Sequence, residues 1–113
     1  MPIIHQFTQA LIGLNPNDDE MPEEAVKVAK IANDNSVIYG LRLAEILNGQ
    51  ILQVTDRPRL IALFYVVNGM MKNCSLALHE FLPGIKALLR TYLRRDQLED
   101  IEPDVEGWND YFG

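Results

Sequence analysis

The sequence predicts an all-α fold, a single-domain bundle of five or six helices packed around a buried central helix at about residues 57–73. Three observations lead to this prediction. Apolar residues recur at spacings of three and four, the period of an α-helix, and no window alternates long enough to indicate a strand. The segment LIALFYVVNGMM, residues 60–71, is apolar at ten of its twelve positions. A helix that is apolar all round is expected to be buried on every side.

The first two helices follow from stripes and turn residues. A helix is expected over residues 2–14, with one apolar face formed by Ile4, Phe7, Leu11 and Leu14. The polar run at residues 15–19 ends it, because proline lacks a backbone donor and Asn and Asp favour turns. A second helix starts at Pro22, and its small residues suit close packing against another helix: Ala25, Val28, Ala29 and Ala32. Residues 33–36 are expected to form a turn and to supply the next N-cap.

The remaining helices are expected after this turn. A third helix runs from about Val37 to about Leu52, with the stripe Tyr39, Leu43, Ile46, Leu47 and Ile51. Thr55 or Asp56 caps the fourth, central helix, which has Pro58 in its first turn, where a missing N–H costs nothing. A fifth helical region carries the stripe Leu78, Phe81, Leu82, Ile85, Leu88, Leu89 and Tyr92. Pro83-Gly84 is expected to kink or restart it.

The charge is unevenly distributed. Residues 1–95 hold ten basic and nine acidic side chains, a net charge of +1, whereas residues 96–113 hold seven acids and no base. We therefore expect a helical domain at 1–95 and an acidic, aromatic C-terminal segment at 96–113. The lone Cys74 and the lack of a signal peptide favour an intracellular protein, with cytoplasm and nucleus not distinguished. No apolar run is long enough to span a bilayer, so no membrane association is expected.

The sequence lacks the residue patterns of common catalytic and metal sites. His5 and His79 are the only histidines, and with Cys74 they cannot supply the four ligands of a zinc site. No glycine-rich phosphate loop and no GxSxG motif is present. Cys74 and His79 are better explained as a buried thiol and a surface imidazole than as a catalytic pair. We expect a non-enzymatic protein without metal or cofactor.

Two groups of polar residues are candidates for binding. Tyr65, Asn68 and Lys72 share one side of the central helix, where a polar side chain must find a partner or face a groove. A basic stripe follows on the fifth helix, and two interpretations stay open: an anion-binding face, or cations at the negative end of a helix dipole. The members of this stripe are Lys86, Arg90, Arg94 and Arg95.

The C-terminal segment is a third candidate. Trp108, Tyr111 and Phe112 stand among acids, and three aromatic residues in the last six are expected to bury themselves on this chain or on a partner. We expect Trp108 to dock on the helical domain. The charge of the segment would then lie against the basic stripe and occupy a site suited to an acidic partner.

Residues 64–73, FYVVNGMMKN, resemble the fourth helix of the RNA polymerase II C-terminal-domain-interacting domain (CID) family. The stretches around Phe7 and Leu11, Leu41–Leu52 and Phe81–Tyr92 resemble its first, third and fifth helices, and Trp108 with Tyr111-Phe112 its late aromatic turn. The resemblance implies a short right-handed superhelix, related to VHS and ENTH domains, whose groove binds a phosphorylated peptide through Tyr65 and Asn68. The chain departs from the family in offering fewer helices, in the register of Arg59-Leu60, and in Gly69 after the key Asn.

Three function classes follow from these features. The first is an interaction module that binds a peptide or helix of another protein in a groove between helices. The second is a small acidic inhibitor or immunity-type protein that blocks a basic site on an enzyme or nucleic-acid-binding protein. The third is an obligate homodimeric structural subunit. Direct binding to nucleic acid is not expected, because the acidic segment repels it.

Overall fold

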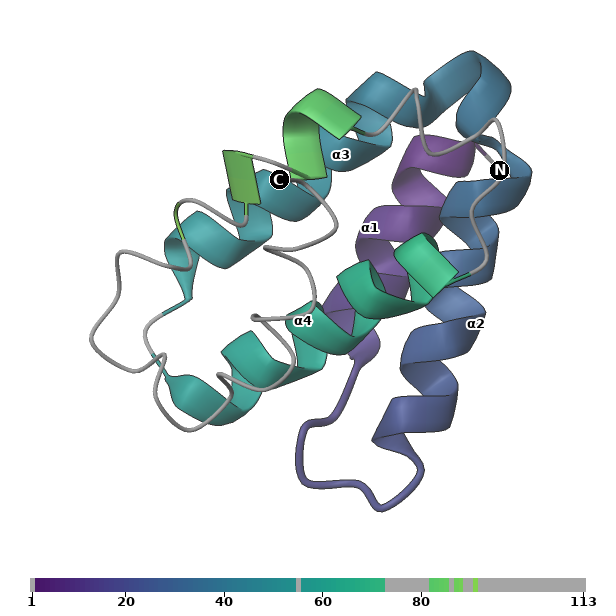
Figure 1. Cartoon of the computed structure of the whole chain (residues 1–113). Helices are drawn as coiled ribbons and strands as arrows, with labels where there is room; N and C mark the ends of the chain where they lie inside the picture. The colour runs from purple at the N-terminus through teal and green to yellow at the C-terminus, as the bar shows by residue number, and fades with distance from the viewer. Residues whose placement is uncertain (1, 55, 73–81, 86, 89–90, 92–113) are drawn as a thin grey trace.

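The computed structural model describes residues 2–54, 56–72, 82–85, 87, 88 and 91 of the chain. Within these residues all regular structure is helical, which confirms the predicted all-α bundle. The helices are α1 (Ile3–Gly13), α2 (Met21–Asp34), α3 (Ser36–Gln53) and α4 (Arg57–Lys72), shown in Figure 1. Residues 82–85, 87, 88 and 91 are also helical and belong to the predicted fifth region.

Side chains from all of these helices form one core. The largest fully buried residues are Phe7 and Leu11 of α1, Leu43, Leu47 and Ile51 of α3, Leu63, Val66, Val67 and Met70 of α4, and Ile85. Helix α2 contributes mainly small residues, as its sequence predicts: Ala25, Val28, Ala29 and Ala32. The 3-4 spacing of apolar residues therefore identified most of the buried side chains of α1, α2 and α3.

Helix α4 is the most buried helix, but it is not enclosed on every side. Ile61, Tyr65 and Asn68 lie on one side of it; Tyr65 is 37% exposed, and the other two are partly exposed. The expectation of burial all round was wrong for this strip. The reason is that Tyr and Asn carry polar groups that remain near the surface, while Leu63, Val66 and Met70 fill the interior.

Helix α4 crosses α2 obliquely and at close range (Figure 1). A Cβ atom added to Gly69 would lie 2.9 Å from the Cβ of Ala29, whereas non-bonded carbon atoms pack at about 3.5–4.0 Å. Asn33 adds a polar contact, because its side-chain amide donates a hydrogen bond of 3.3 Å to the carbonyl oxygen of Met70. The small residues of both helices therefore determine how closely they pack.

A second close approach joins the fifth helical segment to α3. A Cβ atom on Gly84 would lie 2.5 Å from the Cβ of Ala44, and two backbone atoms of Ala44 would be 3.6 Å away. Ile85 and Leu88 on the same segment are buried, in agreement with the predicted stripe. Gly84 is thus required by packing.

Arg59 in the first turn of α4 fixes the end of α1. Its guanidinium donates hydrogen bonds to the carbonyl oxygens of Leu14, at 2.7 Å, and Leu11, at 2.5 Å. The last turn of α1 carries no basic residue, so Arg59 supplies the cation that the negative end of this helix favours. The two bonds connect Arg59 to residues that lie 45 and 48 positions earlier in the sequence.

Three local predictions can be compared with the helix boundaries. The fourth helix is capped as expected, because the Oδ1 atom of Asp56 accepts a hydrogen bond of 2.8 Å from the backbone N–H of Arg59. The expected turn at residues 33–36 is shorter: α2 continues to Asp34, and the Ser36 hydroxyl donates to the carbonyl oxygen of Asn33 instead of capping α3. Tyr39 was wrongly included in the buried stripe and is 39% exposed, with Gly40 on the buried face instead.

Candidate functional site

A concavity of about 460 Å³ lies between α1 and α2, beside the loop at residues 14–20. We call it the α1–α2 groove. Its apolar lining is buried or partly buried and comes from Ala10, Leu14, Met21, Val28 and Ile31. Its polar lining is more exposed and comes from Asn15, Asp18, Glu24 and Lys27. The groove therefore has an apolar floor and a polar rim.

The space exists because α1 ends in small residues. Ala10 and Gly13 line the groove one turn apart, and a Cβ atom added to Gly13 would meet no atom within 4 Å. Opposite them, Val28 and Ile31 of α2 are also one turn apart and supply branched side chains to the floor. The two helices thus pack together without filling the space between their ends.

Hydrogen bonds hold the loop beside the groove in place. The Asn15 side chain accepts a bond of 3.0 Å from the N–H of Asn17, and the Asp18 carboxylate accepts one of 2.9 Å from the N–H of Glu20. Backbone bonds of 3.1 and 3.0 Å link Asp18 to Asn15 and Met21 to Asp18. With Arg59 bound to the last carbonyls of α1, both edges of the groove are fixed.

The rim of the groove is acidic. Of the five carboxylates at residues 18–24, Asp18 and Glu24 line the groove, Asp19 and Glu20 lie in the adjoining loop, and Glu23 on α2 is not part of the lining. Lys27 forms an ion pair of 3.1 Å with Glu24, and Lys30 pairs with Asp34 at 2.8 Å. Among the described residues, the ion pairs involve none of the other four carboxylates.

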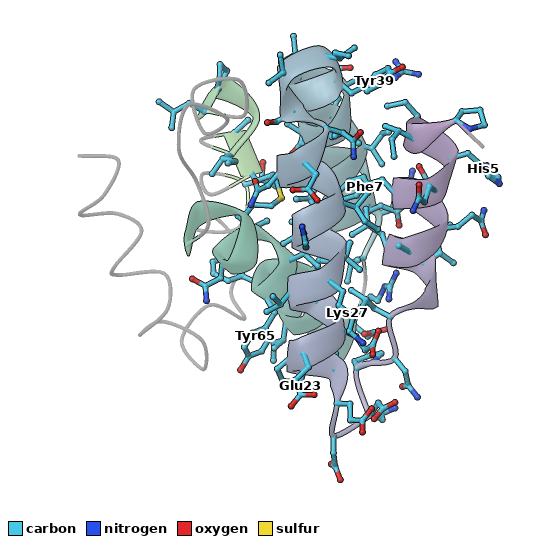
Figure 2. The ribbon with its side chains drawn as sticks, turned by 90° about the vertical axis from the view of Figure 1, so that its right-hand side faces the viewer. His5, Phe7, Glu23, Lys27, Tyr39 and Tyr65 are labelled. Carbon is cyan, nitrogen blue, oxygen red and sulfur yellow. The ribbon has the colours of Figure 1, made fainter. Side chains whose placement is uncertain are left out.

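The predicted peptide site on α4 lies away from this groove. Figure 2 shows Tyr65 on the opposite side of α2 from α1. Asn68 is partly exposed, and it already makes a contact within the protein. Helix α4 ends at Lys72, whose side chain lies outside the described residues, so the structure brings together Tyr65 and Asn68 only as neighbours on one helix.

The other predicted site residues lie outside the described part of the chain. These are the basic stripe of Lys86, Arg90, Arg94 and Arg95 and the aromatic residues Trp108, Tyr111 and Phe112. The domain division at residue 95 also falls there. All of these remain predictions.

A second exposed apolar surface lies at the start of α3. Val37 and Ile38 are 83% and 80% exposed, and Leu41 follows one turn later and is also exposed. Arg42 and Glu45 continue this face, with 4.0 Å between a guanidinium nitrogen of one and a carboxylate oxygen of the other. Exposed aliphatic side chains that cluster in this way are typical of contact surfaces.

The described residues offer no arrangement for metal chemistry. No group of three or more His, Cys, Asp or Glu side chains among them is placed to hold a metal ion. His5 is exposed on the outer face of α1 (Figure 2). No helix in the described ranges has the length and apolar character needed to cross a membrane.

Comparison of the chain with protein-family models, curated proteins and solved structures gives no significant match in any of the three. The resemblance to the CID family therefore stays a prediction. The function must be argued from the surfaces of the protein itself.

Sequence reasoning missed the α1–α2 groove and the role of Arg59. The acidic run at residues 18–24 and the small residues Ala10 and Gly13 at the end of α1 were the available signals for the groove. In the sequence, residues 15–19 are explained as the turn that ends the first helix, and Pro22 as the start of the second. Both roles are compatible with a place beside a groove, but a helical pattern does not reveal which two helix ends come together.

Proposed function

We propose that this chain is a protein-interaction module whose α1–α2 groove receives an apolar side chain from a peptide or helix of a partner protein. The observation that carries the proposal is the combination of a buried apolar floor, with Leu14, Met21 and Val28, and an exposed polar rim. Its volume of about 460 Å³ is within the usual range of about 300–1,000 Å³ for ligand pockets. Clefts of this kind bind through an apolar anchor and use rim groups for orientation.

The groove is also pre-organised, which favours binding. Arg59 holds the end of α1, and the side chains of Asn15 and Asp18 hold the loop. A partner therefore has to order few groups of this protein when it binds, and less of the interaction free energy is lost.

The groove can be filled by one substitution. Gly13→Leu places a side chain into open space, so the core should remain intact while the groove closes. Gly49→Leu is the matched control, because a Cβ atom there also meets nothing within 4 Å and Gly49 lies on α3, outside the groove. Both substitutions replace a helical glycine and add helix propensity, with the larger gain at Gly49 because Gly13 is the last residue of α1.

The test is a selection of peptides from a random library on the full chain, followed by affinity measurement on both variants. We expect Gly13→Leu to weaken binding of the selected peptides at least about tenfold, because about 1.4 kcal/mol of anchor burial is lost. Gly49→Leu should leave it unchanged. Failure to enrich any peptide, or equal binding by Gly13→Leu, would contradict the proposal.

The strip on α4 is a second candidate surface for the same function. Tyr65 is 37% exposed, whereas large apolar residues of α4 such as Leu63 and Val67 are buried, which favours a role in contact with a partner. In this case Tyr65→Ala, and not Gly13→Leu, should remove the binding of the selected peptides. The CID resemblance predicts that those peptides are phosphorylated.

Self-association is a second candidate function, favoured by the exposure of Val37 and Ile38. A second copy related by a two-fold axis would cover these side chains and could exchange the Arg42 and Glu45 partners between protomers. Sedimentation of the full chain tests this function: a dimer that becomes monomeric in Ile38→Lys supports it. A monomer at all concentrations would exclude it.

The acidic inhibitor remains a third proposal, and it depends on residues 96–113, which lie outside the described part of the chain. Salt-sensitive binding to a basic enzyme that is lost when residues 97–113 are deleted would support it.

A further inference from the structure

We infer that the segment bound in the α1–α2 groove is basic, with Lys or Arg beside its apolar anchor. This inference rests on the proposed function and adds the chemistry of the partner. It also separates this groove from the site implied by the CID resemblance, which would bind a phosphorylated and therefore acidic peptide.

The charge of the rim carries the inference. Asp18 and Glu24 line the groove directly, and Asp19, Glu20 and Glu23 lie within the same seven-residue stretch. Among the described residues, Lys27 is the one cation that lines the groove. The charged residues of the lining, Asp18, Glu24 and Lys27, give a net charge of −1, and the exposed carboxylates of Asp19 and Glu20 in the adjoining loop bring the local charge to −3.

The positions of these acids favour contact with a partner over internal pairing. Lys27 is 3.1 Å from Glu24, so this ion pair neutralises one carboxylate. Asp18 uses its Oδ1 atom to hold the N–H of Glu20, which leaves its negative charge beside the groove. Asp19 and Glu20, in the loop beside the groove, are exposed, and no cation of the described residues is paired with them.

An apolar anchor bound at Leu14 and Val28 brings its flanking residues to this rim. Lysine or arginine there meets opposite charge, whereas a carboxylate or phosphate meets like charge, which is unfavourable at an interface. Because the rim is exposed, its attraction for a partner is screened by salt, and at 0.1 M salt it extends only about 10 Å. Binding should therefore weaken as the salt concentration rises.

The experiment uses the peptides selected on the full chain at low salt. We expect enrichment of Lys and Arg beside an apolar residue. Replacing the Lys and Arg of the best peptide by Glu should weaken its binding about tenfold or more, since several exposed charge pairs are reversed together. The affinity of the unchanged peptide should fall when NaCl is raised from about 0.05 to about 0.5 M.

The rim is tested with a variant that removes three charges: Asp18→Asn, Asp19→Asn and Glu20→Gln. Asn at position 18 retains an oxygen for the N–H of Glu20, so the loop can keep its shape. The basic peptide and its Glu counterpart should bind this variant about equally. Glu45→Gln, on the exposed face of α3, is the control and should preserve the difference.

The outcomes separate this inference from the proposed function. If the basic and acidic peptides bind equally, and Gly13→Leu weakens both, then the groove binds peptides without regard to charge and the inference is wrong. A preference for acidic or phosphorylated peptides would also overturn it. If Gly13→Leu has no effect on either peptide, the proposed function itself fails.

Discussion

Replacement of glycine by alanine should lower the free energy of unfolding at two positions of this chain and should not lower it at two others. Gly69 and Gly84 lie at close helix contacts, where an added Cβ atom would be 2.9 Å from the Cβ of Ala29 and 2.5 Å from that of Ala44. Gly13 and Gly49 face open space, with no atom within 4 Å of an added Cβ. All four positions are helical, so replacement by Ala favours each helix by up to about 1 kcal/mol.

The contacts decide the net effect. Carbon atoms pack at about 3.5–4.0 Å, so Gly69→Ala requires the helices to separate by roughly 0.6 Å or more, and Gly84→Ala by roughly 1 Å or more. The clashing atom in each case is the Cβ of an alanine, which cannot move without its backbone. Overpacking costs about 1–3 kcal/mol. Net destabilisation should be up to about 2 kcal/mol for Gly69→Ala and larger for Gly84→Ala, while Gly49→Ala should be stabilising by about 0.5–1 kcal/mol.

Urea unfolding followed by circular dichroism measures these differences in the free energy of unfolding. Ala29→Gly in the Gly69→Ala background should recover part of the loss, because it removes the clashing atom, and a double-mutant cycle isolates this coupling. Equal stabilisation by Gly69→Ala and Gly49→Ala would refute the close crossing of α2 and α4.

Three further predictions concern the bundle. Arg59→Gln should lower the free energy of unfolding by about 2 kcal/mol, because two carbonyls at the end of α1 lose a charged donor. The control Arg42→Gln, on the exposed face of α3, should change it by less than about 0.5 kcal/mol in the same urea titration. Asp56→Ala should cost about 1 kcal/mol through loss of the α4 cap, and Asp56→Asn much less, as measured by thermal unfolding. Leu63→Ala should cost about 2–5 kcal/mol and Tyr65→Ala clearly less, because Leu63 is fully buried and Tyr65 is not; similar losses would show that the two sides of α4 are equally enclosed.

Most of the helical architecture could be predicted because it depends on local patterns. The 3-4 spacing located the buried faces around Phe7, Leu47 and Ile85, and the Asp56 cap followed from a residue type that favours this position. The error at Tyr39 has a physical cause. An aromatic side chain at a stripe position near a helix end can extend past the neighbouring helices.

The candidate site could not be predicted in the same way, because it depends on contacts distant in sequence. Arg59 reaches the carbonyl oxygen of Leu11 across 48 positions, and no periodicity encodes that bond. The α1–α2 groove requires the ends of two helices to meet while the side chains of Ala10 and Gly13 are too small to fill the space. Tyr65 and Asn68 are three positions apart on α4, and Figure 2 shows Tyr65 on the opposite side of α2 from α1, away from the groove.

The central claim is that the α1–α2 groove is where this protein binds its partner. It is tested most directly by ¹H–¹⁵N NMR of the full chain during titration with a selected basic peptide. We expect the largest amide shift changes at Gly13, Leu14 and Val28, and their loss in Gly13→Leu. Shift changes that instead centre on Tyr65 and Asn68 would contradict the claim and place the binding surface on α4.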